Sequence, residues 1–96
     1  MKRQDILDKL ATHGVELKEM GIESLALFGS VARDEGTDAS DVDLLVEFNR
    51  SVGLFHFAHV RRRLSELLGC SVDLATPGAL REEMRQEILQ EAVYAT

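Results

Sequence analysis

Several kinds of residue are scarce in this sequence of 96 residues, and each scarcity excludes a class of protein. The single cysteine, Cys70, rules out an intrachain disulfide and suits the reducing cytoplasm, which is the expected location. One proline and no repeated segment leave no sign of a linker between domains. No apolar run has the form of a signal peptide or the length of a membrane-spanning helix, so no membrane association is expected.

Positively charged residues are also fewer than negatively charged ones. Lys and Arg number 11 against 17 for Asp and Glu, which gives a net charge of −6. Proteins that bind nucleic acid through its phosphates normally carry a basic face, so this balance counts against direct binding of nucleic acid. Hydrophobic residues at 45% and charged residues at 29% are typical of a globular chain. The length predicts one domain over 1–96, without room for a separate substrate domain.

Hydrophobic periodicity predicts alternating helices and strands. Helices are expected over 3–20, 54–68 and 79–91, strands over 22–28, 41–48 and 71–75, a short helical stretch over 31–35, a polar loop over 36–40 and an extended tail. Gly21 and Gly69 are placed to end helices. The order indicates the α/β (α+β) class: a small mixed β-sheet with helices packed on it.

The chemistry resides in carboxylates on the predicted strands. Side chains alternate along a strand, so Asp41 and Asp43 share one face while Val42 points into a core. Two carboxylates this close repel each other unless a cation lies between them, and Mg²⁺ prefers oxygen ligands. If the third strand pairs beside the second, Asp73 joins them, and three carboxylates can hold two metal ions for an in-line displacement.

A glycine-serine turn precedes these carboxylates. Gly29 has no side chain, so its backbone can approach a phosphate closely. Ser30 begins a helical stretch whose N–H groups and hydroxyl can receive an anion. Arg33, one turn further on, is placed to contact a phosphate or to pair with a carboxylate. Taken singly, the turn and the acids are ordinary surface features; it is their order along the chain that favours a site.

The segments LFGSVAR, SDVDLLVEF and VDLATP resemble the minimal nucleotidyltransferases (MNT) of the DNA polymerase β-like nucleotidyltransferase superfamily. The resemblance covers about residues 5–95 and implies a nucleotidyltransferase-like fold. It also implies that Gly29 and Ser30 bind the triphosphate, that Asp41 and Asp43 bind magnesium, and that Asp73 is the third, acceptor-activating carboxylate. One departure is Asp34, where the family commonly has glycine.

The resemblance further implies a function. Family members of this size are commonly antitoxins beside a HEPN toxin, and some silence it by attaching AMP from ATP to a tyrosine. An enzyme that transfers AMP to a protein hydroxyl is therefore expected. Two alternatives stay open: an antitoxin that acts by binding alone, and an enzyme with a small-molecule acceptor. The acceptor, the preferred base and a homo-oligomeric state also stay open.

The one basic run in this acidic chain is Arg61-Arg62-Arg63, on the helix expected over 54–68. It is either a solvated helix face or a contact patch for an acidic partner or a nucleotide phosphate.

Overall fold

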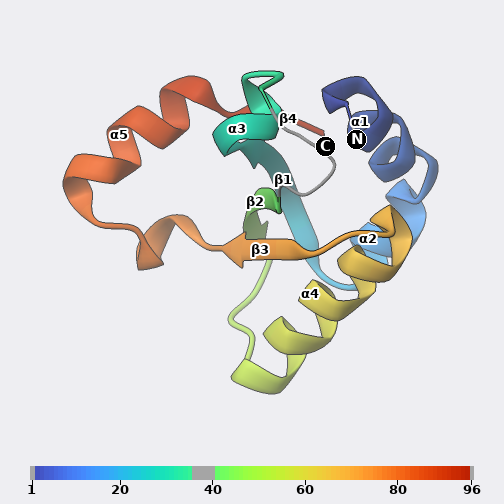
Figure 1. Ribbon diagram of the computed structural model, residues 1–96. Helices are drawn as coiled ribbons and strands as arrows, with labels where there is room; N and C mark the ends of the chain where they lie inside the picture. The colour runs from blue at the N-terminus through green and yellow to red at the C-terminus, as the bar shows by residue number, and fades with distance from the viewer. Residues whose placement is uncertain (1, 36–40, 96) are drawn as a thin grey trace.

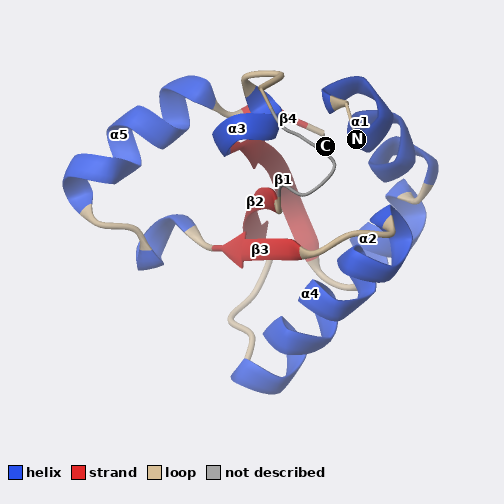
Figure 2. Ribbon diagram, viewed as in Figure 1, coloured by secondary structure: helices blue, strands red, loops and turns tan. Residues whose placement is uncertain are grey.

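The computed structural model describes residues 2–35 and 41–95; the polar loop expected over 36–40, with Ser40 of the quoted motif, lies outside them. Five α-helices and one short 3₁₀ turn accompany the strands in this described part (Figures 1 and 2). They are α1 (Arg3–Thr12), α2 (Gly14–Glu19), α3 (Gly29–Ala32), α4 (Leu54–Leu68), η1 (Pro77–Ala79) and α5 (Glu82–Glu91).

The strands form one mixed sheet, as the sequence predicts. They are β1 (Ile22–Phe28), β2 (Val42–Phe48), β3 (Val72–Ala75) and β4 (Val93–Tyr94), in the order β3-β2-β1-β4. β1 is antiparallel to both of its neighbours, whereas β2 and β3 are parallel. The parallel pair is possible because α4 carries the chain back between them, and parallel neighbours need such a crossover.

The two faces of the sheet are covered unequally. The larger core packs α1, α2 and α4 on one face, with Leu44 and Val46 of β2 and Leu64 of α4 all fully buried. The opposite face packs against α5 through a much smaller cluster of Ala26, Leu45 and Ile88. Since the side chains of β2 alternate, this second face is also the one that carries Asp43.

Several boundaries differ from the prediction for local reasons. The helix expected over 3–20 is two helices, because His13 leaves the helical conformation and Gly14 is a weak helix former. The last helix begins at Glu82 rather than at 79, because Pro77 starts a 3₁₀ turn and Arg81 is extended. β2 and β3 each begin one residue later than expected. None of the described helices is long and apolar enough to cross a membrane.

Candidate active site

The sheet register brings two of the predicted carboxylates together. Asp43 on β2 lies directly opposite Asp73 on the parallel strand β3, and opposite Phe28 at the end of β1. Val42 and Val72, the neighbours of these acids, are buried on the other face. The condition set by the sequence, that the third strand pair beside the second, is therefore met, and both carboxylates stand on the face that α5 covers only in part.

Gly29 lies beside the Asp43 carboxylate, at the end of β1. It follows Phe28 directly, has a φ of +75° and begins α3. A Cβ atom at this position would run into the carboxylate of Asp43. Glycine is therefore favoured here for two independent reasons, the left-handed backbone and the lack of space for a side chain beside Asp43. The backbone of the turn and the carboxylate are thus in direct contact.

The negatively charged form of the Asp43 carboxyl group is destabilised by its surroundings. Burial raises the pKa of its carboxyl group, the nearby charges of Asp73 and Asp41 raise it further, and Arg33 acts in the opposite direction. Asp41 is exposed and lies just before β2. A carboxyl group surrounded by acids lacks a cation, so the donor set fits a hard divalent ion. In the described residues the three acids are near one another, yet no three His, Cys, Asp or Glu side chains are already gathered as a metal site.

The start of α3 offers donors to an anion beside this carboxylate. Phe28 precedes the helix in an extended conformation, and no side chain from the described residues caps it. The first backbone N–H groups, including that of Ser30, are therefore available to a phosphate. A triphosphate at this turn would lie against the carboxylates that need a cation, so the two halves of the predicted site are adjacent.

Arg33 is engaged by carboxylates. Its Nε donates to Glu35 and its Nη1 donates to Glu91 of α5, both at 3.0 Å. These hydrogen bonds raise the pKa of its guanidinium group. The predicted contact with a phosphate would require Arg33 to exchange at least one of these partners. Sequence reasoning did not identify Glu91, since nothing in its surroundings along the chain marks it as a partner of a residue 58 positions away.

Asp34, the departure from the family pattern, has a structural explanation. It is the one residue other than glycine with a positive φ among the described residues, at +61°. Glycine adopts this left-handed conformation without strain, and aspartate is one of the few residues that tolerate it. Its side chain is exposed. The backbone therefore keeps the shape that a glycine would give.

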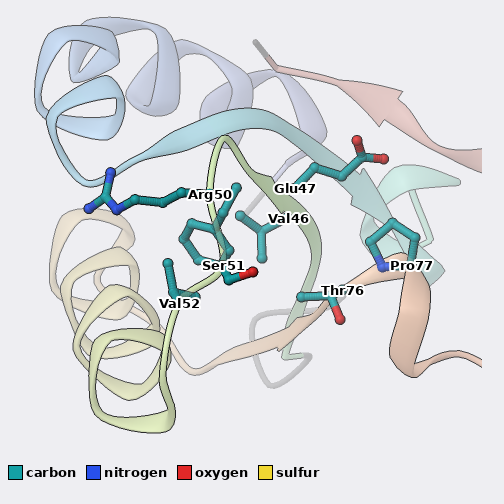
Figure 3. Close-up of a pocket in the computed structure, with 8 residues that line it drawn as sticks. Val46, Glu47, Arg50, Ser51, Val52, Thr76 and Pro77 are labelled. Atoms are coloured by element: carbon teal, nitrogen blue, oxygen red, sulfur yellow. The ribbon is translucent and has the colours of Figure 1, made fainter.

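A pocket that the sequence did not reveal opens at the other end of β2. Its volume is about 480 Å³. Val52 lies on one side of it, with Thr76 and Pro77 on the other (Figure 3). Its lining residues, here called the β2 pocket, are Val46, Glu47, Phe48, Arg50, Ser51, Val52, Thr76 and Pro77.

The three arginines of the basic run on α4 have different surroundings in the structure. Arg63 faces α2, where its Nη2 donates to Glu16 at 3.0 Å, and this pairing lowers the pKa of Glu16. Arg61 and Arg62 are exposed, and neither takes part in a salt bridge within the described residues. Only these two arginines remain as a candidate contact patch.

Comparison with known proteins identifies the family of this chain. Residues 8–95 match the family described as Nucleotidyltransferase domain. The chain is 39% identical to a protein of Methanocaldococcus jannaschii named as a candidate protein adenylyltransferase, over 94% of each chain. It is 36% identical to the protein adenylyltransferase MntA of Thermococcus cleftensis, over 95% of this chain and 93% of that one. A solved structure described as a candidate minimal nucleotidyltransferase has a TM-score of 0.84 and 31% identity, covering 97% of this chain and 95% of the other. The chain therefore belongs to the nucleotidyltransferase family, and it is a minimal nucleotidyltransferase.

Proposed function

We propose that this enzyme transfers AMP from ATP, with magnesium, to a hydroxyl group of a protein acceptor. The observation that carries the proposal is the position of Asp43, which lies against the turn at Gly29 on one side and faces Asp73 on the other. A nucleotide bound at the turn has its phosphates where carboxylate-held cations are needed. The whole-length similarity to proteins named as protein adenylyltransferases supports this choice of reaction.

The reaction is a displacement at the α-phosphorus. The acceptor oxygen forms a bond to that phosphorus, the bond from it to the bridging oxygen of the β-phosphate breaks, and pyrophosphate leaves. Asp73, the more exposed of the paired acids, takes the hydroxyl proton. N–H groups at the start of α3 hold the phosphates in line with the attacking oxygen. When bound by Asp41, Asp43 and Asp73, magnesium ions supply positive charge for the attacking and leaving oxygens.

The proposed partner is a toxin of the HEPN type. One solved structure with the same fold is described as a tri-AMPylated HEPN toxin from Shewanella oneidensis in complex with an MNT antitoxin, with a TM-score of 0.68 and 16% identity. Another is described as a toxin–antitoxin with AMP-PNP, with a TM-score of 0.74 and 17% identity. At these identities the structures establish the fold, and the antitoxin role of this chain is part of the proposal.

If the protein neutralised its toxin by binding alone, it would not need a catalytic site. Covering a toxin does not require carboxylates to be held together against their mutual repulsion, nor a glycine pressed against one of them. Asp43 bears that unfavourable placement, which is visible in its raised pKa. Such a cost is typical of a group kept for chemistry.

Transfer of labelled AMP to a purified toxin of the HEPN type tests the proposal. Asp43→Asn keeps the size of the side chain and removes a charge that holds metal. We expect transfer to fall by about a hundredfold or more, because a displaced or weakened metal site removes most of the transition-state stabilisation. Binding of the toxin should persist.

A matched control is Asp8→Asn on α1, where the side chain accepts a hydrogen bond from Gln4 and asparagine can do the same. It should transfer AMP as the wild type does. Mg²⁺ with ATP should also raise the melting temperature more than ATP with a chelator, since only the folded state binds the pair. If Asp43→Asn neutralises the toxin in cells as completely as the wild type, chemistry is not the function and binding alone is.

A further inference from the structure

The first turn of α4 exposes two large apolar side chains. Phe55 is 93% exposed and its neighbour Leu54 is 80% exposed, more than any other large apolar residue among the described ones. They follow Val52, which lines the β2 pocket, by two and three positions. Two adjacent exposed apolar side chains this near a hollow along the chain are characteristic of a contact site rather than of isolated surface residues.

The same face of α4 becomes basic one turn later. Residues three, four and seven positions apart lie on one side of a helix, so Leu54, Ala58 and Arg61 are aligned, with Phe55 and Arg62 beside them. All of these side chains are exposed. We call Leu54, Phe55, Ala58, Arg61 and Arg62 the outer face of α4. It is apolar beside the pocket and carries two positive charges further along.

The strand β2 connects this surface with the active site. Asp43 lies near its beginning, and Phe48 at its end lines the pocket. Five residues of strand correspond to about 17 Å. A protein seated over the pocket and the outer face of α4 therefore has to extend about 17 Å along the sheet to present an acceptor side chain to the carboxylates, a distance well within the width of a small domain.

We propose that the protein that supplies the acceptor hydroxyl docks here, with an apolar side chain in the β2 pocket, apolar contacts on Leu54 and Phe55, and acidic residues against Arg61 and Arg62. The inference rests on the proposed function and adds where the partner binds and what chemistry its surface has. Charge complementarity indicates the acidic character, because these arginines are a local excess of positive charge on a chain of net charge −6.

Charge also favours a different protein over a second copy of this chain. No Asp or Glu occurs on α4 before Glu66, so the outer face offers no carboxylate between Leu54 and Arg62. In a symmetric dimer both copies contribute the same patch. Two such faces would bring four arginines into one contact with no acid at its centre.

Two pairs of substitutions, each with a matched control, test the docking surface. Leu54→Ser with Phe55→Ser removes the apolar part, and Val15→Ser, at a 75% exposed position on α2, is its control. Arg61→Glu with Arg62→Glu reverses the charges, and Lys9→Glu with Lys18→Glu makes the same change in net charge elsewhere. The affinity for a purified toxin of the HEPN type is measured by calorimetry, and AMP transfer is measured as a function of toxin concentration.

The apolar pair should weaken binding about tenfold to a hundredfold, as loss of a central apolar anchor does, while Val15→Ser stays within about twofold. The charge pair should slow association and reduce its dependence on salt. At saturating toxin both variants should transfer AMP at the wild-type rate, because the reacting groups are untouched.

Three results would overturn or separate the proposals. If both surface variants bind the toxin as the wild type does, the docking surface is wrong even though AMP transfer stands. If binding depends on this surface but the wild type transfers no AMP, the docking surface stands and the proposed reaction fails. If sedimentation shows that the wild type alone is a dimer and Leu54→Ser with Phe55→Ser a monomer, the occupant is a second copy and our assignment is wrong.

Discussion

Gly29→Ala tests whether the contact between the glycine turn and the carboxylate is what makes the site work. Two costs are expected. The first comes from the backbone, since a φ of +75° costs a residue with a Cβ about 1–2 kcal/mol. The second comes from space, since the new methyl group would overlap the Asp43 carboxylate, which must retreat by about 1–2 Å to reach ordinary van der Waals separation.

Gly69→Ala separates these two costs. Gly69 ends α4 with a φ of +70°, and a Cβ there would meet nothing within 4 Å. It therefore carries the same backbone strain without the steric contact. Thermal unfolding should show a loss of about 1–2 kcal/mol for Gly69→Ala and at least as much for Gly29→Ala. For a domain of this size, each kcal/mol corresponds to a decrease in melting temperature of about 4–8 °C.

Activity should distinguish the two variants more sharply than stability does. Displacement of a reacting group by about 1 Å can cost about a hundredfold in rate. We therefore expect AMP transfer by Gly29→Ala to fall by about that factor at a temperature where both variants are folded, while Gly69→Ala keeps the wild-type rate. Equal transfer rates for the two alanine variants would refute the idea that the close approach of Gly29 to Asp43 matters for catalysis.

Three further predictions follow from charges and backbone angles in the site. Because the pKa of Asp43 is raised in the folded state, the contribution of this group to the free energy of unfolding, without divalent ions, should decrease as the pH rises above 3.8, its ordinary value. Asp43→Asn should therefore be the more stable protein at neutral pH and lose that advantage in acid, as urea titrations at several pH values would show. Glu91→Gln should leave stability nearly unchanged, because its ion pair with Arg33 is exposed, and should lower the KM for ATP by freeing the guanidinium group; an unchanged KM would argue against a role of Arg33 in nucleotide binding. Asp34→Gly should stabilise the protein by about 0.5–1 kcal/mol, since relief of the left-handed strain exceeds the added flexibility of the unfolded chain; a lower melting temperature would contradict this.

The parts of the fold that were predictable are those set by local pattern. The strand over 22–28 and the helix over 54–68 have the predicted bounds, because apolar periodicity and a following glycine determine both. The break at His13 was not predicted, because a single glycine is tolerated in many helices and only packing decides where the chain turns. The late start of α5 follows from Pro77, whose 3₁₀ turn cannot be distinguished in the sequence from a first α-helical turn.

The candidate site also has some features that the sequence predicts and others that only the folded structure shows. Side-chain alternation places Asp43 on one face of its strand, and the motif spacing marks Gly29, so both are evident from the sequence. The opposition of Asp43 and Asp73 needs a parallel register that only the folded sheet shows. The partner of Arg33 was not predictable either, because an exposed arginine can pair with many carboxylates and the choice depends on how α5 packs.

The two charge patterns of this small protein lie on two different elements, the strand β2 and the helix α4. At the beginning of β2 the acids are held together, so that end attracts cations and, through them, the phosphates of a nucleotide. On α4, which returns from the end of β2 towards the start of β3, the outer face carries exposed arginines about halfway along the helix, in an otherwise acidic chain. A partner with an acidic patch is repelled from the clustered acids and attracted to the arginines, so its orientation is restricted before contact. For a chain with no second lobe among its described residues, such an arrangement of charge would supply the positioning that an additional domain provides in a larger enzyme.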